Sequence, residues 1–79
     1  MSEPIPLSVK IAARVRGLAA EKNITQMQLA AALGIAQPAV SRRMRGITPW
    51  SLDELAVLGQ LLDVQFAVII GELPMATAW

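Results

Sequence analysis

Three arginines and a serine lie close together in the run SRRMRG at residues 41–46. A guanidinium group carries a permanent charge and forms paired hydrogen bonds to phosphate or to the acceptor edge of guanine. Two glutamines precede this run, Gln26 and Gln37, and a carboxamide can donate and accept hydrogen bonds at the same time. These residue types and spacings predict binding to a polyanion such as DNA rather than bond-breaking chemistry.

The residue types that most enzymes and metal sites need are missing. The chain has no cysteine and no histidine, which excludes disulfides and the usual zinc ligand sets. It also lacks a glycine-rich phosphate loop, and the adjacent acids Asp53 and Glu54 point in different directions on a predicted helix. We therefore expect neither catalytic activity nor a bound cofactor or metal ion.

The net charge of +1 hides an uneven distribution of charges along the chain. All seven basic residues lie between positions 10 and 46, where Glu21 is the only acidic residue, and five acidic residues flank this segment. The basic residues are Lys10, Arg14, Arg16, Lys22, Arg42, Arg43 and Arg45. This segregation predicts one basic face for a polyanion and a second surface for another contact.

The chain is both short and apolar. Its 79 residues allow one domain, and a domain of this size buries only ~60% of the surface of its unfolded chain. Because 54% of the residues are hydrophobic, we expect a subunit interface and hence a homodimer. No apolar run approaches the ~20 residues of a membrane span, and the N-terminus lacks the features of a signal peptide, so we expect a cytoplasmic protein.

Helical periodicity predicts an all-α domain over residues 8–63, after a proline-containing arm over 1–7. Ser8 is the expected cap of a first helix over 9–22. Two further helices begin with a capping box, in which a hydroxyl and a side-chain carbonyl satisfy each other's backbone amides. These pairs are Thr25 with Gln28, before a helix over 26–33, and Ser51 with Glu54, before a helix over 52–62.

A short helix over about 38–45 is predicted between these two capped helices. Gln37 is its expected cap and Pro38 its first residue, because proline is best tolerated in a first turn. Gly46 is expected to end it. On this helix Val40 and Met44 share the inner side, whereas the arginines point outward or to the flanks. The residues expected in the core are Leu29, Leu33, Ile35, Val40 and Met44.

The C-terminal segment over 64–79 has a different character. Its run VQFAVII is rich in β-branched residues and alternates, which predicts a strand. A lone strand would pair with its copy in a second subunit through the face formed by Val64, Phe66, Val68 and Ile70. A short fifth helix packed on the bundle is the competing interpretation. The tail over 72–79 has no clear period, and Trp79 has no predicted contact.

The segment over 26–46 resembles the helix-turn-helix of the Cro and lambda-repressor family of phage and bacterial regulators. The matching residues are Gln26, Leu29-Ala30, Leu33-Gly34-Ile35, Gln37, Val40-Ser41-Arg42 and Gly46. The likeness extends over roughly residues 11–62. It implies a compact bundle of four or five helices, a dimer on an operator, and a recognition helix, the one over about 38–45, in the major groove.

The resemblance also implies roles for individual residues. Gln37 matches a glutamine that contacts an adenine edge, and Gln26 matches one that touches phosphate and can brace Gln37. Arg42 falls at an outward position used to contact bases, where arginine favours guanine. Pro38 stands at the second recognition position, where the family often has a polar residue. Proline lacks that hydrogen bond but can still make an apolar contact to a thymine methyl. The expected phosphate contacts are Ser41, Arg43, Arg45 and Thr48. Arg14 or Arg16 extends this face from the first helix, but only one of the two can easily point that way.

The leading hypothesis is a sequence-specific regulator of double-stranded DNA, most like a phage Cro or immunity repressor, that binds a palindromic operator as a dimer. The alternative is an antitoxin that sequesters a toxin and represses its own operon, a hypothesis based on the acidic, apolar C-terminal third. A fold that serves only protein contacts is disfavoured by the outward arginines.

Overall fold

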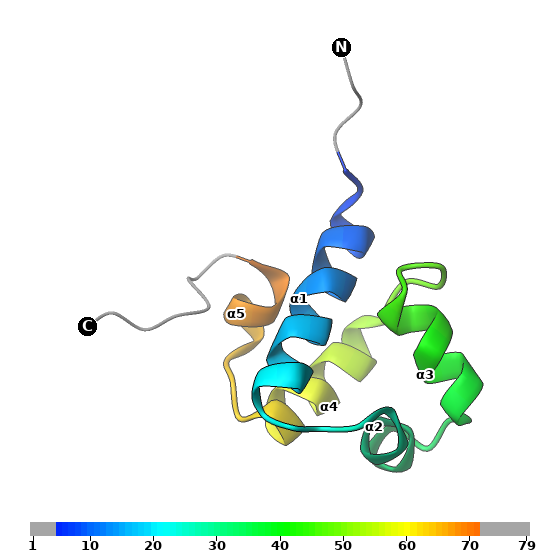
Figure 1. Ribbon diagram of the computed structural model, residues 1–79. Coiled ribbons are helices and arrows are strands. Elements are labelled where there is room, and N and C mark those ends of the chain that lie inside the picture. Colours follow the sequence, from blue (N-terminus) through cyan, green and yellow to red (C-terminus); the bar gives the residue numbers. More distant parts are fainter. Residues whose placement is uncertain (1–4, 72–79) are drawn as a thin grey trace.

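The computed structural model describes residues 5–71 and contains five helices within them (Figure 1). They are α1 (Leu7–Glu21), α2 (Gln26–Leu33), α3 (Gln37–Met44), α4 (Leu52–Leu62) and α5 (Phe66–Ile70). The all-α prediction is confirmed. Residues 1–4 of the arm and 72–79 of the tail, Trp79 included, lie outside the described residues.

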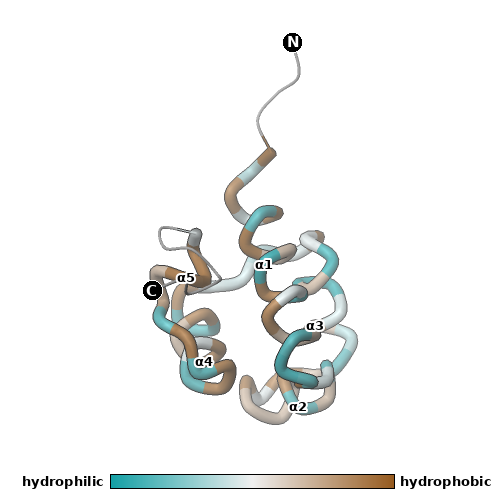
Figure 2. The backbone as a smooth tube through the Cα atoms, turned by 60° about the vertical axis from the view of Figure 1, so that its left-hand side comes forward, coloured by the Kyte–Doolittle hydropathy of each residue, from teal (hydrophilic) through white to brown (hydrophobic). Residues whose placement is uncertain are grey.

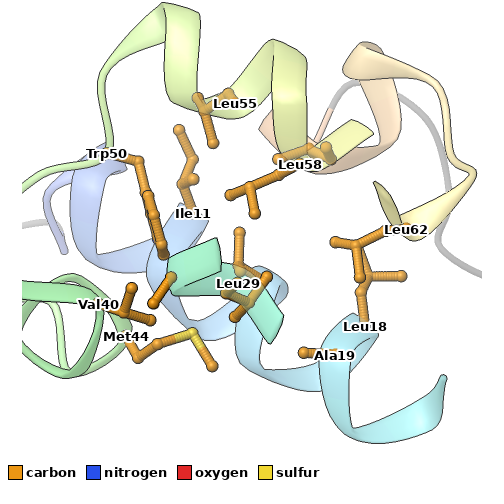
Figure 3. Close-up of a cluster of buried hydrophobic side chains, with 13 residues drawn as sticks. Ile11, Leu18, Ala19, Leu29, Val40, Met44, Trp50, Leu55, Leu58 and Leu62 are labelled. Atoms are coloured by element: carbon orange, nitrogen blue, oxygen red, sulfur yellow. The ribbon is translucent and has the colours of Figure 1, made fainter. Parts of the chain in front are cut away.

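One hydrophobic core joins all five helices. In Figure 3 Leu29 of α2 lies among side chains from α1, α3 and α4. The core is formed by Ile11, Val15, Leu18, Ala19, Leu29, Ala30, Val40, Met44, Trp50, Leu55, Leu58, Leu62 and Ile69. Of the residues expected in the core, Leu29, Val40 and Met44 are buried, whereas Leu33 and Ile35 are only partly buried and pack against its edge.

Both predicted capping boxes are present. The Thr25 hydroxyl accepts from the Gln28 amide at 3.1 Å, and the Gln28 side chain accepts from the Thr25 amide at 2.8 Å. The Ser51 and Glu54 pair repeats this arrangement at the start of α4. Each box satisfies two backbone amides that have no partner within the helix, which fixes where these helices begin.

Two helices begin one or two residues earlier than expected. The carbonyl of Pro6 accepts from the amides of Val9 and Lys10, so Pro6 rather than Ser8 precedes α1. Ala36 rather than Gln37 precedes α3, which puts Pro38 at the second helical position. Proline is tolerated there because the first four amides of a helix lack an intrahelical partner in any case. The helix ends at Met44, one residue earlier than expected.

The predicted strand over 64–70 is wrong, and the competing fifth helix is confirmed. Asp63 has a φ of 55°, and the Val64 amide donates to the Gly59 carbonyl at 3.0 Å, so the chain turns back at the end of α4. The following α5 packs on α1 and α4 and buries Ile69 completely, whereas Phe66 remains 40% exposed. The helix satisfies its own backbone within one chain, which an unpaired strand cannot do.

Substitution of Ile69 distinguishes these two conformations. Ile69→Ala should lower the free energy of unfolding by about 2–5 kcal/mol, because it leaves a cavity between α5 and the core. Phe66→Ala should cost less than Ile69→Ala, because the Phe66 ring is partly in solvent. Urea denaturation followed by circular dichroism measures both. A larger loss from Phe66→Ala would contradict the helical packing of this segment.

Candidate nucleic-acid interface

The α2 and α3 helices pack against each other across a short turn, and α3 lies at the edge of the bundle (Figure 1). Gly34 ends α2 with a φ of 69°, a left-handed conformation that favours glycine. Only Val40 and Met44 of α3 are buried, and hydrophilic colours run along much of its length (Figure 2). The predicted inward direction of these two side chains is confirmed, whereas Pro38 and Arg42 are exposed and the other four residues of the helix are partly buried.

The two predicted glutamines lie together where α2 and α3 begin. Gln37 Nε2 donates a hydrogen bond to Gln26 Oε1, which joins the first residues of the two helices. The bond leaves the Gln37 carbonyl oxygen and one of its N–H groups available. A carboxamide held in this way keeps both a donor and an acceptor for a ligand.

Arg42 and Arg45 have exposed side chains at the C-terminal end of α3. Arg45 Nε donates to the Ser41 carbonyl at 3.4 Å, a contact within the same helical turn. Ser41 and Thr48 are partly buried beside them, and the Thr48 amide donates to the Arg42 carbonyl at 3.4 Å. The structure therefore brings these four predicted residues to one end of one helix.

Arg43 has a different environment from its neighbours. Its Nε lies 3.1 Å from Glu54 Oε1, and its Nη1 donates to the Ala39 carbonyl at 3.1 Å. Its side chain is only 19% exposed. Arg43 therefore forms an ion pair from α3 to the start of α4, and its expected phosphate contact stays a prediction. Sequence spacing did not reveal this pairing because the partners lie 11 residues apart on different helices.

The two arginines of α1 diverge. The Arg14 guanidinium lies against Gly71, where a Cβ would come within 3.2 Å of Arg14 Nη2, so this side chain faces the end of α5. Because α5 and α3 flank opposite sides of α1 in Figures 1 and 2, Arg14 lies on the side of α1 away from α3, and its expected phosphate contact stays a prediction. Arg16, the other arginine that the sequence offered for extending the basic face, donates from Nη1 to the Met44 carbonyl at the end of α3.

The helix-turn-helix family profile matches residues 15–69 of the chain. The chain belongs to the helix-turn-helix family. The clp gene regulator ClgR from C. glutamicum has a similar crystal structure, with 28% sequence identity and a TM-score of 0.76. That similarity covers 86% of this chain and 87% of the other. A comparison with curated protein sequences finds no significant match.

Family membership makes the chain a DNA-binding protein of the transcription-regulator class. Within residues 5–71, no group of three or more acidic side chains could hold a metal ion. None of the helices described here is long and apolar enough to cross a membrane.

Glu54 supports the helix-turn-helix from outside it. Burial by itself would raise the pKa of this carboxyl, but the backbone hydrogen bond from Ser51 and the pairing with Arg43 together hold the pKa below its ordinary value of 4.5. One carboxylate oxygen accepts from both the Ser51 amide and the Arg43 Nε. The same group thus caps α4 and fixes Arg43 of the recognition helix.

This pairing predicts a pH dependence of stability. Because the folded pKa of Glu54 is lowered, its contribution is complete above pH 4.5 and is lost as the pH falls through the lower folded value. Glu54→Gln should be less stable than wild type at neutral pH, and the difference should shrink on acidification. Thermal unfolding from pH 7 to pH 3 measures it, and a constant difference would contradict the role of the ion pair.

Proposed function

We propose that this protein is a sequence-specific regulator that binds a palindromic operator as a homodimer and blocks transcription, most like a phage Cro or immunity repressor. The observation that carries the proposal is the exposed face of α3, where the Gln26-braced Gln37 and Arg42 lie on the same short helix. In a dimer two such helices would enter successive major grooves ~34 Å apart.

Three residues are proposed to contact bases. The braced carboxamide of Gln37 can accept from adenine N6 and donate to N7, and Arg42 can donate to guanine O6 and N7. Pro38 is exposed in the first turn of α3 and would contact a thymine methyl. Specificity therefore depends on two polar side chains and one apolar contact for each half-site.

The proposed phosphate contacts are Gln26, Ser41, Arg45 and Thr48, which surround the base-contacting residues. Such contacts position a protein on the duplex without carrying sequence information. Arg43 and Arg14 are left out of this set, because one is paired with Glu54 and the other lies beside α5. Their roles are better explained by contacts within the domain.

The proposed dimer interface uses the surface of α5 and Val64, which lies two residues before this helix. Phe66 is 40% exposed, and Val64, Val68 and Ile70 are partly buried in the isolated chain. Ile69 faces the core of its own chain, so the interface would be formed by helix surfaces rather than by paired strands. Burial of such apolar area is the main favourable term in association.

Alanine substitution of two arginines tests base contact against phosphate contact. Arg42→Ala should cost about 1–3 kcal/mol on the cognate operator and relax the preference at one base position, because a paired contact to guanine is lost. Arg45→Ala is the matched control and should weaken binding to all sequences alike. Titrations against DNA upstream of the gene and against random duplex measure both. Equal losses on the two DNAs for Arg42→Ala would exclude it as a base contact.

A positive charge introduced at Phe66 tests the proposed dimer interface. Phe66→Lys should convert a dimeric wild type to a monomer in sedimentation equilibrium, because it buries an unpaired charge in the interface. Met27→Lys changes a more exposed apolar residue on α2, which is 68% exposed, and should leave the dimer intact. A dimer that survives Phe66→Lys would place the interface elsewhere.

Co-purification of the protein with the products of neighbouring genes distinguishes the antitoxin hypothesis from the repressor hypothesis. A stable complex with the product of a neighbouring gene would favour an antitoxin, whereas a stand-alone gene beside a divergent promoter would favour the repressor. A basic helical face serves DNA binding in both cases, so the DNA measurements above do not depend on this outcome.

A further inference from the structure

The carbonyl groups at the C-terminal end of α3 have hydrogen-bond partners that come from two sources. The Ser41 carbonyl accepts from the Arg45 amide, the Arg42 carbonyl from Ile47, and the Arg43 carbonyl from Gly46. These donors all belong to the turn that follows the helix. The last carbonyl of the helix, that of Met44, accepts instead from the guanidinium of Arg16 on α1.

A donor from another helix has consequences that a local donor lacks. A charged hydrogen bond is stronger than a neutral one, and a cation at a helix C-terminus also interacts favourably with the helix dipole. The amides of the turn can donate to the carbonyls of α3 in any position of the helix, because the turn moves together with the helix. The Arg16 contact is satisfied only when the end of α3 lies at one place against α1.

The recognition helix needs such a constraint because it is short and mostly outside the core. It has eight residues and buries only Val40 and Met44, and helices of this length are not stable alone. Its beginning is joined to α2 by the Gln26–Gln37 bond, and Arg43 joins it to α4. Arg16 provides the connection from α1 at the end where Arg42 and Arg45 lie.

We propose that Arg16 is a positioning residue for DNA recognition, which holds the C-terminal end of α3 through the Met44 carbonyl and thereby sets the orientation of Arg42. This role rests on the proposed function. It differs from a phosphate contact, the other role open to an exposed arginine beside a DNA-binding helix. A positioning residue affects the preference for the operator, whereas a phosphate contact affects all DNA equally.

The test compares Arg16→Gln with Lys10→Gln, which removes one positive charge from an exposed position of the same helix. Binding to the cognate operator and to random duplex is titrated over a range of salt concentrations. Arg16→Gln should weaken cognate binding about tenfold and random binding about twofold at most, whereas Lys10→Gln should weaken both to the same extent. Arg16→Lys restores a charged donor and should recover part of the preference.

A second measurement uses the free protein. Hydrogen exchange of the Ile47 amide, which donates to the Arg42 carbonyl at the end of α3, should accelerate about tenfold in Arg16→Gln and stay unchanged in Lys10→Gln. Unfolding temperatures of both variants show that the domain stays folded. The exchange measurement detects the loosened helix end without any DNA.

The outcomes distinguish failure of the positioning role from failure of the proposed function. Equal losses on cognate and random DNA in Arg16→Gln, with a salt dependence reduced by about one ion, would make Arg16 a phosphate contact and overturn the positioning role. Unchanged preference beside unchanged Ile47 exchange would also overturn it, while the wild type still discriminates. A wild type that shows no preference for any operator would overturn the proposed function and this role with it.

Discussion

A helix that contacts DNA must be exposed and must also be held in one orientation. In this domain the other helices hold α3 in place while one of its faces stays exposed. An eight-residue helix cannot supply its own stability, and α3 contributes only Val40 and Met44 to the core. Polar contacts to the neighbouring helices therefore fix the position of α3, because its two buried side chains are too few to do so. They join α3 to α2 through Gln37, to α4 through Arg43 and to α1 through Arg16.

These contacts divide residues that look equivalent in the sequence. A run of arginines predicts a basic face, and that prediction holds for Arg42 and Arg45, whose side chains are exposed. Arg43 is neutralised by Glu54, and Arg14 lies beside α5. Helical periodicity gives the direction of a side chain from its own axis, but it does not give the group that lies there on another helix. The sequence therefore indicated that Arg14 and Arg16 diverge, but it did not indicate which groups Arg14, Arg16 and Arg43 would contact.

The features that the sequence predicted correctly are local ones. Capping boxes at Thr25 and Ser51 depend on residues three positions apart, and the left-handed end of α2 depends on Gly34 alone. The strand prediction failed because it used intrinsic preference, which packing overrides: a single helical turn buries Ile69 in the core and pairs its own backbone. The Gln26–Gln37 contact was predictable only because the family resemblance pointed to it.

The division of the arginines also changes what the charge of the domain means for binding. Affinity for DNA depends on salt in proportion to the phosphates that basic side chains contact. Seven basic residues would suggest a steep dependence, yet Arg43 has a carboxylate partner and Arg14 lies on the side of α1 that faces α5. Fewer charges then reach the duplex than the composition suggests. If Gln37 and Arg42 contact bases as proposed, these contacts then supply a larger share of the binding free energy, which favours specific over non-specific binding.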